Sequence, residues 1–178
     1  VIGPGLGRSA QTLESVQKLT QTINVPTVVD ADALYAIGQQ RLEKYSYRDT
    51  FVLTPHDAEY RYLTGHKPEK DRVSDVRDAA KKLNATILLK GPATVIAHPN
   101  GRCFIVNNGD QRLATAGTGD VLSGIIGGLL SRGIAPFEAA AAGAWLHAEA
   151  ANRCSSNGMI ASDIINALPE VLCETDMG

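Results

Sequence analysis

The chain has 178 residues, of which 44% are hydrophobic, and a formal net charge of -2. This length allows one globular domain with a sizeable core. The small net charge gives no electrostatic basis for binding nucleic acid or an anionic membrane, and no apolar run is long enough to span a bilayer. Cys103, Cys154 and Cys173 are odd in number and widely spaced, which predicts no disulfide framework or zinc site and favours a reducing, cytoplasmic location.

The expected elements alternate between strands and helices along the chain. Val1-Ile2 runs into Gly3 and is expected to be the end of a strand that begins outside this sequence. Strands are predicted at 26–31, 50–54 and 86–90, and a hairpin at 94–97 and 102–106. Helices are predicted at 10–22, 32–37, 60–63, 74–83, 120–132, 136–154 and 161–172. This order predicts an α/β fold with a mostly parallel sheet, helices on both faces, and ligands beyond the carboxyl ends of the strands.

The segment Gly117-Thr118-Gly119-Asp120 precedes an apolar run with helical spacing. Glycines allow several backbone N–H groups to face one point, and a helix start adds partial positive charge, so the segment predicts a phosphate site. Taken alone, Asp120 is most simply a helix-capping acid. Beside a phosphate it can instead accept the proton of a substrate hydroxyl that attacks phosphorus, which indicates a kinase-type reaction.

Other motifs at predicted strand ends have both a functional and a structural interpretation. The segment from Lys90 to Thr94 is either a phosphate contact or an ordinary turn, and the P-loop pattern is absent. In Thr54-Pro55-His56-x-x-Glu59, the histidine can bind a polar substrate and the glutamate can orient a hydrated metal, or both only shape a turn. Asp30 and Asp32 would point the same way in an extended chain, where they hold magnesium through water or, for Asp32 especially, cap the next helix.

The motifs taken together resemble the ADP/ATP-dependent NAD(P)H-hydrate dehydratases, a branch of the ribokinase-like superfamily. They are Gly-Pro-Gly-Leu-Gly at 3–7, Asp-Ala-Asp-Ala-Leu at 30–34, Leu-Thr-Pro-His-x-x-Glu at 53–59, Lys-Gly-x-x-Thr at 90–94, the glycine-rich segment 113–126, and 158–163. Their order and spacing span essentially the whole chain. The resemblance implies that residues 1–178 are the C-terminal portion of a single ribokinase-like domain, without its N-terminal strands and part of its substrate pocket.

The resemblance implies a repair reaction on NADH or NADPH that has added water to its nicotinamide ring. The hydroxyl of the S epimer is phosphorylated by ADP or ATP, and phosphate then leaves to restore the dihydronicotinamide. Asp120 is the implied base and contacts the hydrate, as do Gly5, Gly7 and His56. Glu59 is the implied water-mediated contact to Mg²⁺. The implied nucleotide contacts are Lys90, Gly91, Pro92, Ala93, Thr94, Gly117, Thr118 and Gly119.

The resemblance also implies a homo-oligomer, often a tetramer, and an epimerase as partner or fused domain. Two positions depart from the family pattern: Ala58 replaces a glycine, and Arg112 lies where Gly-Asn-x-Gly is usual. The first is tolerable unless that position needs a positive φ, and the second is expected to affect nucleotide preference. Two alternatives stay open, a kinase of a small hydroxylated metabolite or vitamin precursor, and a nucleotide-binding module without catalysis. His147, in an alanine-rich helix, is interpreted as a packed or surface histidine.

Overall fold

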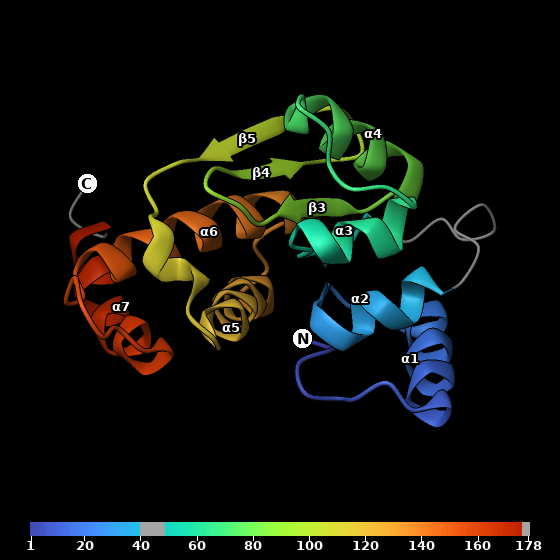
Figure 1. Cartoon of the computed structure of the whole chain (residues 1–178), viewed down its shortest axis with the longest axis horizontal. Coiled ribbons are helices and arrows are strands. Elements are labelled where there is room, and N and C mark those ends of the chain that lie inside the picture. The colour runs from blue at the N-terminus through green and yellow to red at the C-terminus, as the bar shows by residue number, and fades with distance from the viewer. Residues whose placement is uncertain (40–48, 176–178) are drawn as a thin grey trace.

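The computed structural model describes residues 1–39 and 49–175, and its strands form one sheet in the order β1-β2-β3-β4-β5 (Figure 1). The strands are β1 (Thr27–Val29), β2 (Phe51–Leu53), β3 (Thr86–Leu89), β4 (Thr94–Ala97) and β5 (Cys103–Val106). The pairs β1–β2 and β2–β3 are parallel, and β3–β4 and β4–β5 are antiparallel. The sheet is therefore mixed, with its parallel part where the predicted sites lie.

The expected strand end at the N-terminus is also present. Ile2 forms a parallel bridge with Val29 on the outer side of β1. The predicted hairpin is confirmed, because Val95 pairs with Ile105 and the chain turns at Asn100-Gly101.

Seven helices connect or follow these strands in the described residues. They are α1 (Ala10–Thr22), α2 (Ala31–Gly38), α3 (Asp57–Thr64), α4 (Arg72–Leu83), α5 (Thr118–Ser131), α6 (Pro136–Asn152) and α7 (Ala161–Thr175). Local signals set several of their ends. The Ser9 hydroxyl accepts the Thr12 N–H at the start of α1, and Gly65, at φ +86°, ends α3 in the left-handed conformation.

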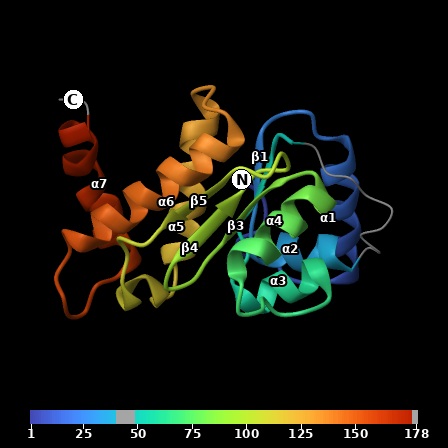
Figure 2. The same cartoon turned by 90° about the horizontal axis from the view of Figure 1, so that it is seen from above.

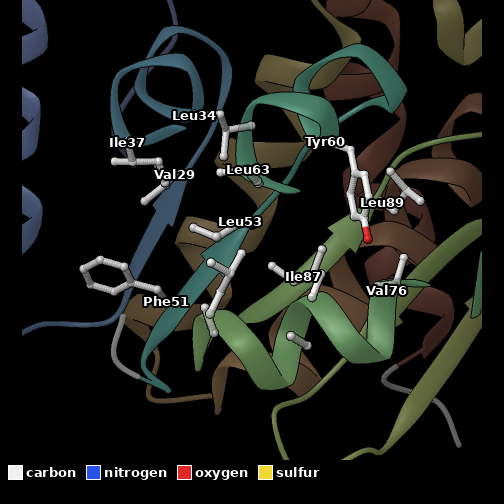
Figure 3. Close-up of a cluster of buried hydrophobic side chains, with 14 of the residues drawn as sticks. Val29, Leu34, Ile37, Phe51, Leu53, Tyr60, Leu63, Val76, Ile87 and Leu89 are labelled. Atoms are coloured by element: carbon white, nitrogen blue, oxygen red, sulfur yellow. The ribbon is translucent and has the colours of Figure 1, made fainter. Parts of the chain in front are cut away.

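The sheet separates two hydrophobic layers (Figure 2). Successive strand residues point to opposite faces, so Val29 and Leu53 pack against α1–α4, whereas Val28 and Val52 pack against α5 and α6. Figure 3 shows the first layer, where strand side chains meet those of α2, α3 and α4. The α/β prediction with helices on both faces is confirmed.

Small residues allow α6 to approach α5 closely. A Cβ added at Gly143 would lie 2.6 Å from Ile126 Cγ1. Helix α7 packs on α6 and α5 through a third apolar cluster that includes Leu146 and Ile164. The apolar side chains of α1 are unequally covered: Val16 is buried, whereas Leu19 is 44% exposed.

The parallel arrangement of β1, β2 and β3 brings their carboxyl ends to one edge of the sheet. Asp30, Thr54 and Lys90 directly follow these three strands. The motifs predicted at strand ends therefore lie on neighbouring strands.

Candidate functional site

The Lys90 ammonium joins the ends of the three parallel strands. Its Nζ lies 3.0 Å from Asp30 Oδ1 and 3.7 Å from Glu59 Oε2. Its backbone N–H donates to the Pro55 carbonyl at 2.8 Å, which fixes the Lys90 loop beside the Thr-Pro-His segment. The Lys90 side chain is 22% exposed, whereas that of Asp30 is 2% exposed. The cation thus has buried partners on one side and an accessible side.

The amino end of α5 faces this cation. Gly117 begins the helix at φ +87°, a left-handed conformation that favours glycine. The buried Thr118 hydroxyl donates to the carbonyls of Leu113 at 2.7 Å and Thr115 at 2.8 Å, which holds the loop in place. A Cβ added at Gly119 would lie 3.6 Å from Lys90 Nζ. The Thr118 N–H donates to the Thr115 carbonyl at 3.3 Å, whereas within residues 1–39 and 49–175 the N–H groups of Gly119 and Asp120 have no acceptor. These two N–H groups and the ammonium can together attract an anion.

Asp120 lies in the first turn of α5 and its side chain is exposed. Among residues 1–39 and 49–175, no hydrogen bond or ion pair occupies its carboxylate. A base must have a free lone pair within reach of the proton that it takes. Asp120 meets this requirement beside the anion site, whereas a capping aspartate would be bonded to its own helix.

His56 and Glu59 form a capping box at the start of α3. His56 Nδ1 accepts the N–H groups of Ala58 at 3.1 Å and Glu59 at 3.3 Å, and Glu59 Oε2 accepts the His56 N–H at 3.0 Å. The structural interpretation of this motif is therefore correct. It does not remove the functional one. Accepting at Nδ1 places the ring hydrogen on Nε2, which lies 3.4 Å from Glu59 Oε1, and the His56 side chain is 54% exposed, so a substrate can still reach the ring.

The site does not form a metal cage from protein side chains. No group of three His, Cys, Asp or Glu side chains suited to a metal ion occurs in the described part of the chain. Glu59 is occupied by the capping box and by Lys90, and direct coordination would break these contacts. The residues fit a hydrated Mg²⁺ that arrives on nucleotide phosphates and reaches Glu59 through water, which is the usual way Mg²⁺ binds in such sites.

Asp30 and Asp32 do not point the same way, contrary to the prediction. Ala31 begins α2 with φ +48°, so the chain is not extended here and the two carboxylates diverge. Asp30 turns inward to Lys90 and to Ser123, whose Oγ donates at 2.7 Å. Asp32 turns to the glycine loop, where it accepts from Gly7 N at 2.9 Å and Arg8 Nε at 2.7 Å. The two carboxylates therefore do not face a common point where they could hold Mg²⁺ together, and neither side chain caps α2.

The Arg8 contact has an electrostatic consequence for Asp32. The hydrogen bond from the guanidinium holds the pKa of Asp32 below its usual value, so the carboxylate stays charged. Gly5 at φ +70° and Gly7 at φ +75° both require glycine for their conformation, and no other group lies within 4 Å of a Cβ added there. The loop is open, and Asp32 anchors it to α2. In the part of the chain that the structure describes, no hydrogen bond joins Gly5 or Gly7 to Asp120.

The predicted nucleotide loop, Lys90 to Thr94, connects β3 to β4 and is held by Arg72, which no sequence motif indicated. Arg72, at the start of α4, donates through Nη2 to the Lys90 carbonyl at 3.1 Å and pairs through Nη1 with Asp57 at 2.8 Å. A Cβ added at Gly91 would lie 2.7 Å from Arg72 Nη2. Arg72 is the last of four consecutive charged residues, 69–72, and no sequence signal distinguishes it from the others.

His147 is a second residue whose contact with the site no sequence signal indicated. It lies in α6, is 5% exposed, and its ring forms a hydrogen bond with the backbone of Thr118, the first residue of α5. Burial lowers the pKa of His147 to about 4, and only partly does the bond to Thr118 oppose this. Its Nε2 is buried without a partner in the described residues. Of the two positions left open for His147, packed or on the surface, the structure shows the packed one, and its contact with Thr118 was not expected.

The two departures from the family pattern have structural explanations. Ala58 is within α3 and has no positive φ, so alanine fits there without strain. Arg112 pairs with Asp110 and donates to the Cys154 carbonyl at 3.0 Å, so it ties the 3₁₀ helix Gln111–Ala114 to the end of α6. In residues 1–39 and 49–175, no helix combines the length and apolar character that crossing a membrane demands.

Comparison with known proteins shows similarity to one family. Residues 1–170 match the family described as NAD(P)H-hydrate dehydratase. The chain is 43% identical over 178 residues to the bifunctional NAD(P)H-hydrate repair enzyme of Moorella thermoacetica, covering 96% of this chain and 34% of that protein. It is 39% identical over 171 residues to the ADP-dependent (S)-NAD(P)H-hydrate dehydratase of Neisseria meningitidis, covering 93% and 58%.

Solved structures show the same fold. The Bacillus subtilis ADP/ATP-dependent NAD(P)H-hydrate dehydratase co-crystallised with ATP/Mg²⁺ matches with a TM-score of 0.82 and 31% identity, over 97% of this chain and 63% of that one. A ribokinase-like superfamily protein of Enterococcus faecalis matches with a TM-score of 0.83 and 29% identity, over 97% and 62%. The chain spans about a third of the bifunctional relative and less than two thirds of the others. By sequence and by its ribokinase-like fold, the chain belongs to the NAD(P)H-hydrate dehydratase family.

Proposed function

We propose that the protein repairs hydrated NADH or NADPH, acting on the S epimer with ADP or ATP as phosphate donor. The observation that carries this proposal is the meeting of three groups at one place: the amino end of α5, the Lys90 ammonium and the unpaired Asp120 carboxylate. Two of these groups attract a phosphate and the third can accept a proton. The names of the Moorella and Neisseria relatives support the choice of substrate.

In the proposed reaction, Asp120 accepts the proton of the ring hydroxyl as that oxygen attacks the terminal phosphorus of the nucleotide. The bond between this phosphorus and the bridging oxygen breaks, and ADP leaves as AMP (or ATP as ADP). The ring nitrogen then donates its electron pair and expels phosphate with the former hydroxyl oxygen. Loss of a proton from the neighbouring ring carbon restores the dihydronicotinamide. Atoms and charge balance without an oxidant or reductant.

The protein supplies charge and position in this reaction. N–H groups in the first turn of α5 and Lys90 stabilise the phosphoryl group in transfer, and the half-exposed His56 ring is proposed to contact the hydrate. Lys90, Gly91, Pro92, Ala93 and Thr94 are the proposed nucleotide contacts, with Gly117, Thr118 and Gly119. Gly5 and Gly7 are proposed to contact the hydrate. Mg²⁺, brought by the nucleotide and near Glu59, neutralises phosphate charge when bound.

The assay follows the return of dihydronicotinamide absorbance when NADH hydrate, ADP and Mg²⁺ are mixed with the protein. We expect Asp120→Asn to reduce the rate by a factor of about a hundred or more, because a general base contributes about 10²–10⁴-fold. Asp78→Asn is the matched control, since Asp78 is an exposed aspartate on α4. Absence of recovery with the wild type, or equal rates for Asp120→Asn and the control, refutes the proposal.

The same assay separates the two alternatives. A kinase of another hydroxylated metabolite would accumulate a stable phosphate ester and restore no NADH. A nucleotide-binding module would bind ADP equally well with Asp120→Asn and turn over no hydroxyl substrate. An epimerase partner or fused domain, a homo-oligomer and the cytoplasmic location stay predictions, to be tested by the gene's full reading frame, by light scattering and by cell fractionation.

A further inference from the structure

The buried carboxylate of Asp30 connects two parts of the site that are distant in the sequence. It accepts hydrogen bonds from Lys90 Nζ at 3.0 Å and from Ser123 Oγ at 2.7 Å, across 60 and 93 residues of chain. Ser123 is fully buried and lies on α5, three residues after Asp120. One carboxylate thus joins the cation to the helix that carries the proposed base.

The backbone around Asp30 leaves its side chain little freedom. The Asp30 N–H donates to the Ile2 carbonyl at 3.0 Å. The Asp30 carbonyl oxygen lies so close to Gly3 that a Cβ added there would be 1.7 Å from it. The next residue, Ala31, has φ +48°, a conformation that non-glycine residues rarely adopt. Strain of this kind gathers at functional sites, where the surrounding structure maintains it. Here it directs Asp30 inward while Asp32 turns outward.

Fold stability alone does not account for this ion pair. A buried ion pair stabilises a fold no better than apolar side chains of the same volume, because both charges lose water. The pair is also open at one end: Lys90 is partly exposed, and its Nζ lies beside Gly119 at the amino end of α5. Asp30 therefore holds the inner side of an ammonium whose outer side faces the anion site.

We propose that Asp30 is a positioning residue that keeps the Lys90 ammonium and the first turns of α5 in a set arrangement. This inference rests on the proposed function, since it assigns Asp30 to the transfer of the phosphoryl group rather than to nucleotide binding. Without the Asp30 charge, Lys90 keeps its contact with Glu59 and still attracts the nucleotide. The loss is in the alignment of the ammonium, the helix N–H groups and Asp120 around the phosphorus, on which the rate of transfer depends.

The kinetic test is Asp30→Asn, compared with Lys90→Met and with the control Asp78→Asn. For Asp30→Asn we expect kcat to fall by about tenfold or more while KM for ADP changes by less than about threefold, the pattern of an interaction made in the transition state. Lys90→Met is expected both to lower kcat and to raise KM for ADP. A kcat for Asp30→Asn within about twofold of the wild type, or a KM that rises in step with the loss of kcat, overturns the proposal.

Ser123→Ala provides a milder variant if Asp30→Asn does not fold. It removes only the link between Asp30 and α5 and leaves the Lys90 pair intact. We expect the same split between kcat and KM at smaller amplitude. Its matched control is Ser131→Ala at the end of the same helix, where the exposed hydroxyl donates to the Gly128 carbonyl within its own helix. Equal kinetics for the two serine variants would contradict the inference.

A measurement without turnover separates this inference from the proposed function. In protein with nitrogen-15 lysine, the Lys90 ammonium signal, assigned with Lys90→Met, should exchange slowly with water and shift when ADP is added. Asp30→Asn should lose this signal while ADP affinity, measured by calorimetry, stays within about threefold. A wild type that restores no NADH refutes the proposed function. An unchanged Lys90 signal in Asp30→Asn refutes the positioning role, whatever the activity.

Discussion

The buried His147 should make the folded protein sensitive to mild acid. Its ring is 5% exposed, and burial lowers its pKa from the usual 6.5 to about 4. The unfolded chain therefore binds a proton at His147 at a higher pH than the folded chain does. Stability that is complete above about pH 6.5 is lost progressively as the pH falls toward about 4, because proton binding favours the unfolded state.

The size of this loss follows from the two pKa values. Each pKa unit corresponds to about 1.4 kcal/mol, so the full difference is on the order of 3 kcal/mol, and about 2.5 kcal/mol of it is lost between about pH 7.5 and about pH 4.5. This is a large fraction of the net stability of a typical domain, which is about 5–15 kcal/mol. Because the ring bonds to the backbone of Thr118, the protonation also disturbs the loop before α5.

The assay is urea unfolding of the wild type and of His147→Gln at both pH values. Glutamine has a similar length and can still donate a hydrogen bond, but it does not titrate. We expect the wild type to lose about 2.5 kcal/mol more than His147→Gln on acidification. His66→Gln, at an exposed position, is the control and should lose as much as the wild type. Equal losses for the wild type and His147→Gln would refute the reasoning.

Three further predictions concern the backbone and the nucleotide loop. Gly3→Ala should destabilise the protein by about 3 kcal/mol or more in urea unfolding, because the new Cβ would overlap a backbone carbonyl. Gly5→Ala has open space around the new Cβ and should cost about 1–2 kcal/mol. The reasoning fails if the two glycine variants unfold alike. Ala31→Gly should raise the free energy of unfolding by about 1 kcal/mol, because glycine adopts a φ of +48° without strain. The control Ala33→Gly, at a buried helical position, should lower it. A destabilised Ala31→Gly would show that Ala31 is not strained. Arg72→Lys should raise KM for ADP by about threefold to tenfold with little loss of stability, because one ammonium cannot replace the two guanidinium contacts. An unchanged KM would exclude a role of Arg72 in shaping the loop from Lys90 to Thr94.

Much of the fold follows from local patterns in the sequence. Ser9, Gly65 and Asn100-Gly101 each marked a helix end or a turn that the structure contains. The β-rich runs and the helical spacing predicted the α/β class because one face of each element must be apolar to be buried. The glycine-rich segment at 117–119 predicted a helix start, which the structure contains, and its phosphate binding stays a prediction.

Side-chain partners at the site depended on tertiary structure. Asp30 and Asp32 are two residues apart, yet the φ of Ala31 sends them to different partners, and no local pattern indicates a left-handed alanine. Ser123 and His147 looked like ordinary helix residues, because their roles depend on groups from other elements. Spacing along a chain determines which residues share a face of one element. Which charges meet across 60 or 93 residues is determined by how the elements pack.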